Sequence, residues 1–195
     1  MRNAEISRRT TETDIELSLE LDGTGVSDID SGCGFMDHML TLLTKHGGFD
    51  LSLRCTGDAR VDYHHSVEDI GICLGDALRA ALGDMAGVKR FAHAILPMDE
   101  ALVLTAIDVS GRGHLEFDLS LPSQRLGDFD TELVQEFFAA FARRAGITLH
   151  VKELSGANTH HIVEAAFKSL ARSLREAVSL DPRLDGAIPS TKGVL

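Results

Sequence analysis

The chain has 195 residues and a net charge of −11, from 19 Lys and Arg against 30 Asp and Glu. Hydrophobic residues make up 44% and charged residues 25%, a balance that excludes disordered, collagen-like and coiled-coil proteins. The acidic excess argues against a nucleic-acid or anionic-membrane partner, because both need clustered Lys and Arg. No apolar run approaches the roughly 20 residues that span a bilayer, and the first residues lack the apolar core of a signal peptide. The three cysteines form no CxxC pair, so we expect a cytoplasmic protein with reduced thiols.

Apolar periodicity divides the chain into strands with period two and helices with period 3.6. In the first part it predicts a strand over 15–21, a turn over 22–25, a helix over 35–46, a strand over 49–55 and a helix over 67–82. In the second part it predicts a strand over 102–109, a turn over 110–113, a strand over 115–119, a helix over 134–145, a strand over 147–151 and a helix over 163–178. Ser66, three residues before Asp69, predicts a capping box at the start of the second helix.

The two parts repeat each other in letters as well as in pattern. The turn DGTG at 22–25 aligns with SGRG at 110–113, and HHSVE at 64–68 aligns with HHIVE at 160–164. A repeat of this size predicts an α+β fold of two similar half-domains, 1–92 and 93–195, packed about a pseudo-twofold axis. Each half-domain would hold a small sheet packed with two helices.

The repeated HHxxE motif is the strongest chemical signal. Residues i, i+3 and i+4 share one face of a helix, so the histidines and the glutamate can converge on one ion. Imidazole and carboxylate together bind divalent transition metals. His38, on the first turn of the 35–46 helix, and Glu136, in the matching helix, are plausible further ligands. The motif residues are His64, His65, Glu68, His160, His161 and Glu164.

Several basic residues are candidate contacts for a small anion. Glycines let backbone N–H groups approach an anion, and Arg can grip one with two hydrogen bonds. The spacing of these residues does not match a P-loop, so the sequence does not support nucleotide binding. The candidates are Arg90, Arg112, Lys168 and Lys192.

Together these motifs resemble a known family. They are GFMDHML (34–40), DYHHSVEDIG (62–71), PMDEAL (97–102), SGRG (110–113), the stretch 156–175 that begins GANTHHIVEAAFKSL, and PSTKG (189–193). In this order, over nearly the whole chain, the sequence resembles imidazoleglycerol-phosphate dehydratase, the lyase of histidine biosynthesis. The resemblance implies half-domains of the ribosomal-protein-S5-domain-2-like type. It also implies a large homo-oligomer, a 24-mer in the family, with active sites at subunit interfaces.

The resemblance further implies roles for individual residues. Two manganese ions would occupy each site. One would take His38, His65, Glu68 and His160; the other would take His64, His161, Glu164 and residue 136. Many relatives have His at this last position, so Glu136 is a departure. Glu12 corresponds to the acid/base glutamate. The phosphate of the small-molecule substrate would be held by Arg90, Arg112, Lys168, Ser190 and Lys192.

Residue chemistry by itself leaves three functions open. A dehydratase, a two-metal phosphoesterase and a non-catalytic metal-binding protein could all use these ligands. The family motifs favour the dehydratase, which would convert D-erythro-imidazole glycerol phosphate to imidazole acetol phosphate.

Overall fold

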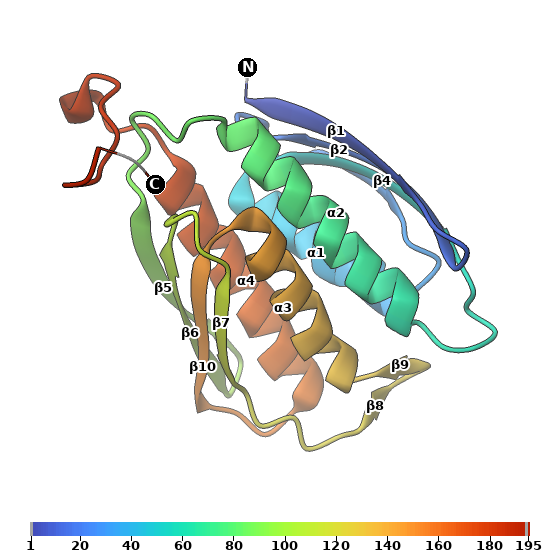
Figure 1. Ribbon diagram of the computed structural model, residues 1–195. Coiled ribbons are helices and arrows are strands. Elements are labelled where there is room, and N and C mark those ends of the chain that lie inside the picture. Colours follow the sequence, from blue (N-terminus) through green and yellow to red (C-terminus); the bar gives the residue numbers. More distant parts are fainter. Residues whose placement is uncertain (1, 194) are drawn as a thin grey trace.

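Two four-stranded sheets enclose two layers of helices (Figure 1). The computed structural model describes residues 2–193 and 195. The first sheet has the order β1-β2-β4-β3, and the second has the order β5-β6-β10-β7. The first sheet contains β1 (Asn3–Arg9), β2 (Thr13–Glu20), β3 (Ser27–Asp30) and β4 (Asp50–Gly57). The second contains β5 (Phe91–Met98), β6 (Ala101–Asp108), β7 (His114–Asp118) and β10 (Thr148–Ser155).

The helices supply the two inner layers. They are α1 (Gly34–Gly47), α2 (His64–Leu82), α3 (Glu132–Ala145) and α4 (Thr159–Val178). A short hairpin, β8 (Arg125–Leu126) and β9 (Phe129–Asp130), precedes α3, and a 3₁₀ turn (Pro182–Leu184) follows α4. Within the described residues, no helix has both the length and the apolar character that crossing a membrane demands.

The predicted α+β class and its repetition are confirmed by the topology. In both sheets the last strand of the order, β3 or β7, runs parallel to its neighbour, while the other neighbouring strands are antiparallel. The order of elements is also the same in both halves, apart from the inserted β8–β9 hairpin. The second sheet begins at Phe91, and the boundary between residues 92 and 93 stays a prediction.

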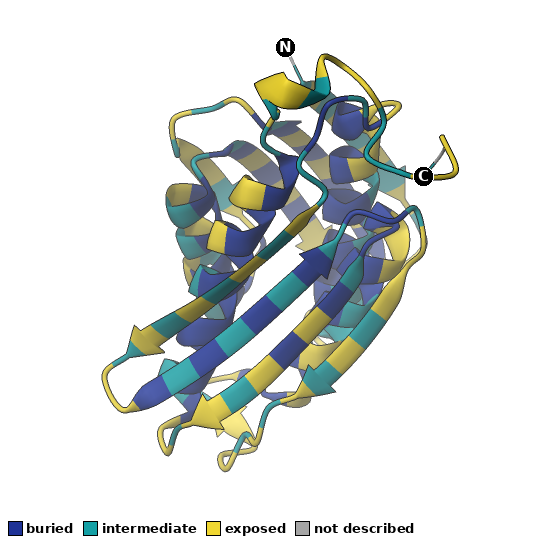
Figure 2. Ribbon diagram, turned by 90° about the vertical axis from the view of Figure 1, so that its left-hand side faces the viewer, coloured by how far each residue is buried: buried dark blue, intermediate teal, exposed yellow. Residues whose placement is uncertain are grey.

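The sequence pattern found the helices and the inner strands but missed β1, β3 and β5. β1 is an edge strand whose inward residues are only half-buried, so its alternation is weak. β5 carries two exposed apolar residues on its outward face, Phe91 and Ile95, which hides the alternation. In Figure 2 this edge strand has exposed and intermediate bands only, whereas buried bands alternate along the inner strands. The predicted capping box at Ser66 is wrong: α2 begins at His64, whose N–H is bound by the Asp62 carboxylate, and Ser66 lies buried inside the helix.

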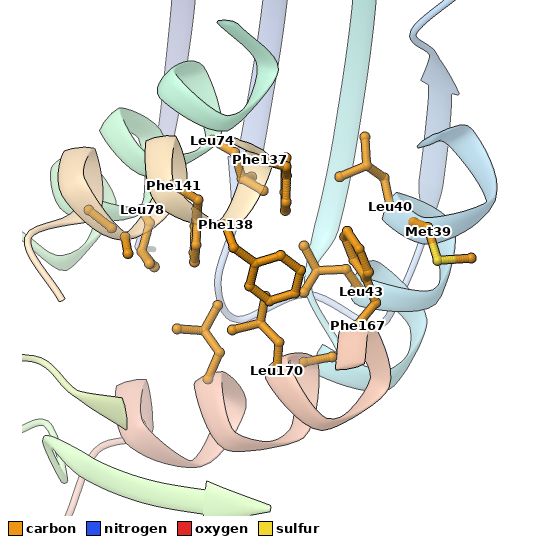
Figure 3. Packing of buried hydrophobic residues seen from close by; sticks show 14 of the residues in the cluster. Met39, Leu40, Leu43, Leu74, Leu78, Phe137, Phe138, Phe141, Phe167 and Leu170 are labelled. Carbon is orange, nitrogen blue, oxygen red and sulfur yellow. The ribbon is translucent and has the colours of Figure 1, made fainter. Parts of the chain in front are cut away.

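The core lies between the two helix layers and is built around phenylalanines. The rings of Phe137 and Phe138, on α3, lie 5.3 and 5.1 Å from the ring of Phe167, on α4. Leucines of α1 and α2 complete the packing around them (Figure 3). Each fully buried aromatic ring contributes about 1.5–3 kcal/mol through the apolar surface that it removes from water. This core holds α1 against α4 and α2 against α3.

Two glycines let α2 approach α3 closely. A Cβ atom on Gly75 would lie 2.7 Å from the carbonyl oxygen of Phe141, and one on Gly71 would lie 2.9 Å from the carbonyl oxygen of Phe137. Backbone atoms cannot move aside as a flexible side chain can. Glycine at these positions therefore sets the distance between the two helices.

We expect Gly75→Ala to lower stability by about 1–3 kcal/mol, because the added methyl group overpacks the α2–α3 contact. Gly34→Ala is the matched control: it is also a helical glycine, but a Cβ there meets no atom within 4 Å. Gly34→Ala should leave stability unchanged or raise it by about 0.5–1 kcal/mol through helix propensity. Thermal unfolding of both variants checks this, and equal melting temperatures would contradict the close-contact explanation.

Candidate metal centre

The packing of α1 on α4 brings three candidate ligands together. His38 comes from the first turns of α1, and His160 and Glu164 come from the first turns of α4. The Nε2 atoms of His38 and His160 lie 3.4 and 3.3 Å from Oε2 of Glu164. One donor atom from each residue falls within a span of 4.8 Å, and in the described part of the chain this is the only such group of three. Two imidazoles and a carboxylate suit a divalent transition metal.

Lys168 adds a positive charge to this cluster from one helical turn further along α4. Its Nζ lies 2.5 Å from Oε1 of Glu164, and the Glu164 side chain is only 10% exposed. Burial raises the pKa of the Glu164 carboxyl, but the hydrogen bond and the charge of Lys168 outweigh it and the net shift is downward. Glu164 is therefore held as a carboxylate, the form that can bind a cation.

The start of α2 carries the equivalent histidines of the first half. His65 Nδ1 lies 3.0 Å from the Asp58 carboxylate, and its Nε2 lies 3.8 Å from Oε1 of Glu12. The Asp58 hydrogen bond raises the pKa of His65. The neighbouring ring of His64 lies 6.2 Å from that of His65 at nearly a right angle. Glu12 therefore lies beside the first HHxxE motif, with half of its side chain exposed.

The second histidine of the α4 motif is also held by a carboxylate. His161 Nδ1 lies 2.7 Å from Oε2 of Glu100, and its Nε2 lies 3.9 Å from Oδ2 of Asp99. The hydrogen bond with His161, followed by a backbone N–H from Asn158, lowers the pKa of Glu100 to about 2. The Glu100 hydrogen bond in turn raises the pKa of His161.

The remaining two candidate ligands lie on the α2–α3 side of the core. Glu68, on α2, is paired with Arg143 of α3 at 3.4 Å. Glu136 is half-buried on α3 and occupies the position in that helix that His38 occupies in α1. The pseudo-twofold relation thus places Glu136, His64 and Glu68 as the counterpart of His38, His160 and Glu164.

Apart from Lys168, the candidate anion contacts lie near the Phe91 end of β5. The Arg90 guanidinium binds the Asp108 carboxylate at 2.7 Å and the carbonyl oxygen of Pro189 at 2.8 Å. Arg112 approaches the same carboxylate at 3.9 Å and is largely exposed. Ser190 follows Pro189, and its hydroxyl accepts the backbone N–H of Lys192 at 3.2 Å. Four of the five predicted phosphate contacts therefore share one region of the surface.

Comparison with known proteins identifies the family. A family model described as Imidazoleglycerol-phosphate dehydratase matches residues 31–174, which is most of the chain. The chain belongs to the imidazoleglycerol-phosphate dehydratase family. It is therefore an enzyme of a metal-dependent hydro-lyase family, as the sequence motifs predict.

Individual imidazoleglycerol-phosphate dehydratases match over their full length. Those of Desulforamulus reducens and Cereibacter sphaeroides are each 58% identical to this chain, cover all of it, and are themselves covered to 98% and 100%. The crystal structure of the dehydratase from Staphylococcus aureus superposes with a TM-score of 0.84 at 38% identity, over 92% of this chain and 99% of that one. The Pyrococcus furiosus enzyme in complex with (S)-C348 gives 0.84 at 40% identity, over 97% and 100%.

Among the described residues, neither of the two ligand sets implied by the family resemblance comes together inside one chain. Glu164 lies with His38 and His160, whereas the implied sets give Glu164 to one metal and the two histidines to the other. His65 lies elsewhere, against Asp58 and Glu12. The assignment of each ligand to a metal stays a prediction.

Sequence reasoning missed the carboxylates that hold the two motif histidines. Asp58 and Glu100 are 7 and 61 residues from the histidines that they contact. Both carboxylates lie outside the helices that carry the histidines, so helical periodicity cannot reveal either pair. Glu100 does lie in the PMDEAL motif that supported the family resemblance, which was the one available signal.

Proposed function

We propose that the chain removes water from D-erythro-imidazole glycerol phosphate in histidine biosynthesis and retains the phosphate, giving imidazole acetol phosphate. The observation that carries this proposal is the cluster of His38, His160 and Glu164, built by a chain whose full-length relatives are imidazoleglycerol-phosphate dehydratases. We further propose that the enzyme works in the cytoplasm, as its three free, buried cysteines allow.

We propose that each site holds two Mn²⁺ ions. His38, His160 and Glu164 supply two nitrogens and a carboxylate held ionised by Lys168. His64, His65, His161, Glu68 and Glu136 are the further ligands of the proposal. When bound, the ions would draw electron density from the ring nitrogens of the substrate imidazole and lower the pKa of its N–H. Glu136 in place of His adds a second carboxylate, a harder ligand that suits Mn²⁺.

Glu12 is the proposed acid/base. It is half-exposed, so a substrate can reach it, and it lies 3.8 Å from Nε2 of His65. In the reaction a C–H bond and a C–O bond of the glycerol chain break, and water leaves. The product of this loss is an enol, which tautomerises to the ketone. Glu12 would carry the proton between carbon and the departing hydroxyl, a role that typically contributes 10²–10⁴-fold.

The phosphate contacts support a site shared between copies of the chain. Lys168 lies at the Met98 end of β5, where its Nζ is 3.4 Å from the Met98 sulfur. Arg90 lies at the opposite end, directly before Phe91, and is paired with Asp108. At roughly 3.3 Å per residue, the two ends of this strand are about 23 Å apart. A phosphorylated three-carbon chain on an imidazole ring spans only on the order of 10 Å. We propose that Arg90, Arg112, Ser190 and Lys192 of one copy hold the phosphate at the metal centre of another, within a large homo-oligomer.

The direct test is turnover after chelation and addition of Mn²⁺, with ketone and free phosphate followed together. We expect Mn²⁺-dependent ketone without phosphate release. Phosphate release without ketone would replace the proposal with a two-metal phosphoesterase. Tight Mn²⁺ binding without turnover would leave a metal-binding protein.

Glu12→Gln should lower turnover at least about a hundredfold, because the amide cannot carry a proton. Metal affinity and substrate binding should stay close to the parent values, since the side chain keeps its size. Rapid-quench assays measure the first and calorimetry the second. Glu16→Gln, on the outward face of β2, is the matched control and should keep full turnover. Near-normal turnover in Glu12→Gln would refute the assigned role.

Shared sites predict complementation between inactive variants. His160→Ala removes a metal ligand and Arg112→Ala removes a phosphate contact, and each alone should be inactive. When the two are co-expressed, random assortment in a symmetric oligomer should restore about a quarter of the parent activity. Activity no greater than that of the separate variants would show that each chain supplies both groups to its own site.

A further inference from the structure

The two halves hold their second motif histidines with different carboxylates. In the first half Asp58, from the loop after β4, faces His65. In the second half Glu100, from the turn between β5 and β6, faces His161. Glu100 immediately precedes β6, as Glu12 immediately precedes β2, so the repeat makes Glu100 the counterpart of Glu12. Equivalent glutamates of the duplication thus have different partners.

Both oxygens of Glu100 are committed to the start of α4. Oε2 lies 2.7 Å from Nδ1 of His161, and Oε1 accepts the backbone N–H groups of Ala157 and Asn158 at 3.2 and 2.8 Å. The Asn158 side chain then accepts the N–H groups of His160 and His161 and caps the helix. Glu100 therefore anchors the loop, the cap and one histidine ring together.

This arrangement fixes the tautomer of His161. At neutral pH Glu100 is a carboxylate, which the two backbone N–H donors on Oε1 favour, and a carboxylate can only accept hydrogen bonds. Nδ1 of His161 must therefore carry the proton, and in the neutral ring Nε2 keeps its lone pair. A carboxylate that binds one ring nitrogen in this way orients the other nitrogen toward a metal.

We infer that Glu100 is a positioning residue that keeps Nε2 of His161 free for metal. Asp58 does the same for His65, but its amide variant should still keep the tautomer of that ring. The inference rests on the proposed function, because it assumes that His161 is a metal ligand. The difference between the two carboxylates comes from their other contacts. Both oxygens of Asp58 lie 3.0–3.1 Å from Nδ1 of His65, and in the described part of the chain no N–H donates to them besides that ring.

The amide variants of the two carboxylates should therefore behave differently. In Asp58→Asn the amide oxygen can still accept from Nδ1–H, so the tautomer of His65 is kept. In Glu100→Gln the single oxygen is needed by the two backbone N–H groups, which leaves the NH₂ group facing Nδ1 of His161. Nδ1 must then accept, the proton moves to Nε2, and the lone pair that would bind metal is lost.

Two measurements on the full-length protein test this inference. In the metal-free protein at alkaline pH, nitrogen-15 NMR reports the tautomers of the neutral rings of His65 and His161. Calorimetry with Mn²⁺ alone reports metal affinity. We expect His161 to switch to the Nε2–H form in Glu100→Gln, with Mn²⁺ affinity about 10–100-fold lower. Asp58→Asn should keep the parent tautomer of His65 and the parent affinity within about threefold.

An unchanged His161 tautomer in Glu100→Gln would overturn the inference, and so would an equal loss of affinity in Asp58→Asn. A switched tautomer with unchanged Mn²⁺ affinity would overturn the step from His161 to the metal. None of these outcomes decides whether the parent protein forms ketone, so failure here is separable from failure of the proposed function. Melting temperatures of the metal-free variants control for unfolding of the loop before α4.

Discussion

The contact between the two helix layers is the constraint on which the rest of the structure depends. Each sheet buries one face on its own pair of helices, and neither pair is covered on its other side until the two halves meet. Phe137, Phe138 and Phe167 fill that joint. The contact between the helix layers also assembles the candidate metal ligands, because the packing of α1 on α4 brings His38 next to Glu164, 126 residues away in the sequence.

The glycines on the other side of the joint show how closely the geometry is specified. Gly71 and Gly75 bring the backbone of α3 against α2, while α1 meets α4 through side chains of Leu, Met and Phe. The two equivalent interfaces of the duplication thus differ in how their helices make contact. This divergence accompanies a difference in donors, since Glu136 stands in α3 where His38 stands in α1.

Periodicity and repetition were enough to predict the α+β class, the four helices and the inner strands. They were enough because these elements bury one face and expose the other, as β2 and β6 do at every second residue. β5 escaped because its outward face carries Phe91 and Ile95. For the site, the motifs found the histidines, but the contacts of Glu100 and Asp58 depend on how turns and loops meet the helix starts. Such contacts leave no periodic trace in a sequence.

Duplication also explains how one fold can assign different roles to equivalent residues. Glu12 and Glu100 stand at the same place in the repeat, each just before the second strand of its sheet. Where Asp58 already holds the ring of His65, Glu12 is left half-exposed and available for the proton transfer that we propose. In the second half the loop between β10 and α4 reads Gly-Ala-Asn over 156–158 and carries no carboxylate, and Glu100 holds His161 instead. A glutamate whose two oxygens are both occupied by N–H donors is a poor proton shuttle, which is why the proposed acid/base role falls to Glu12 and not to Glu100.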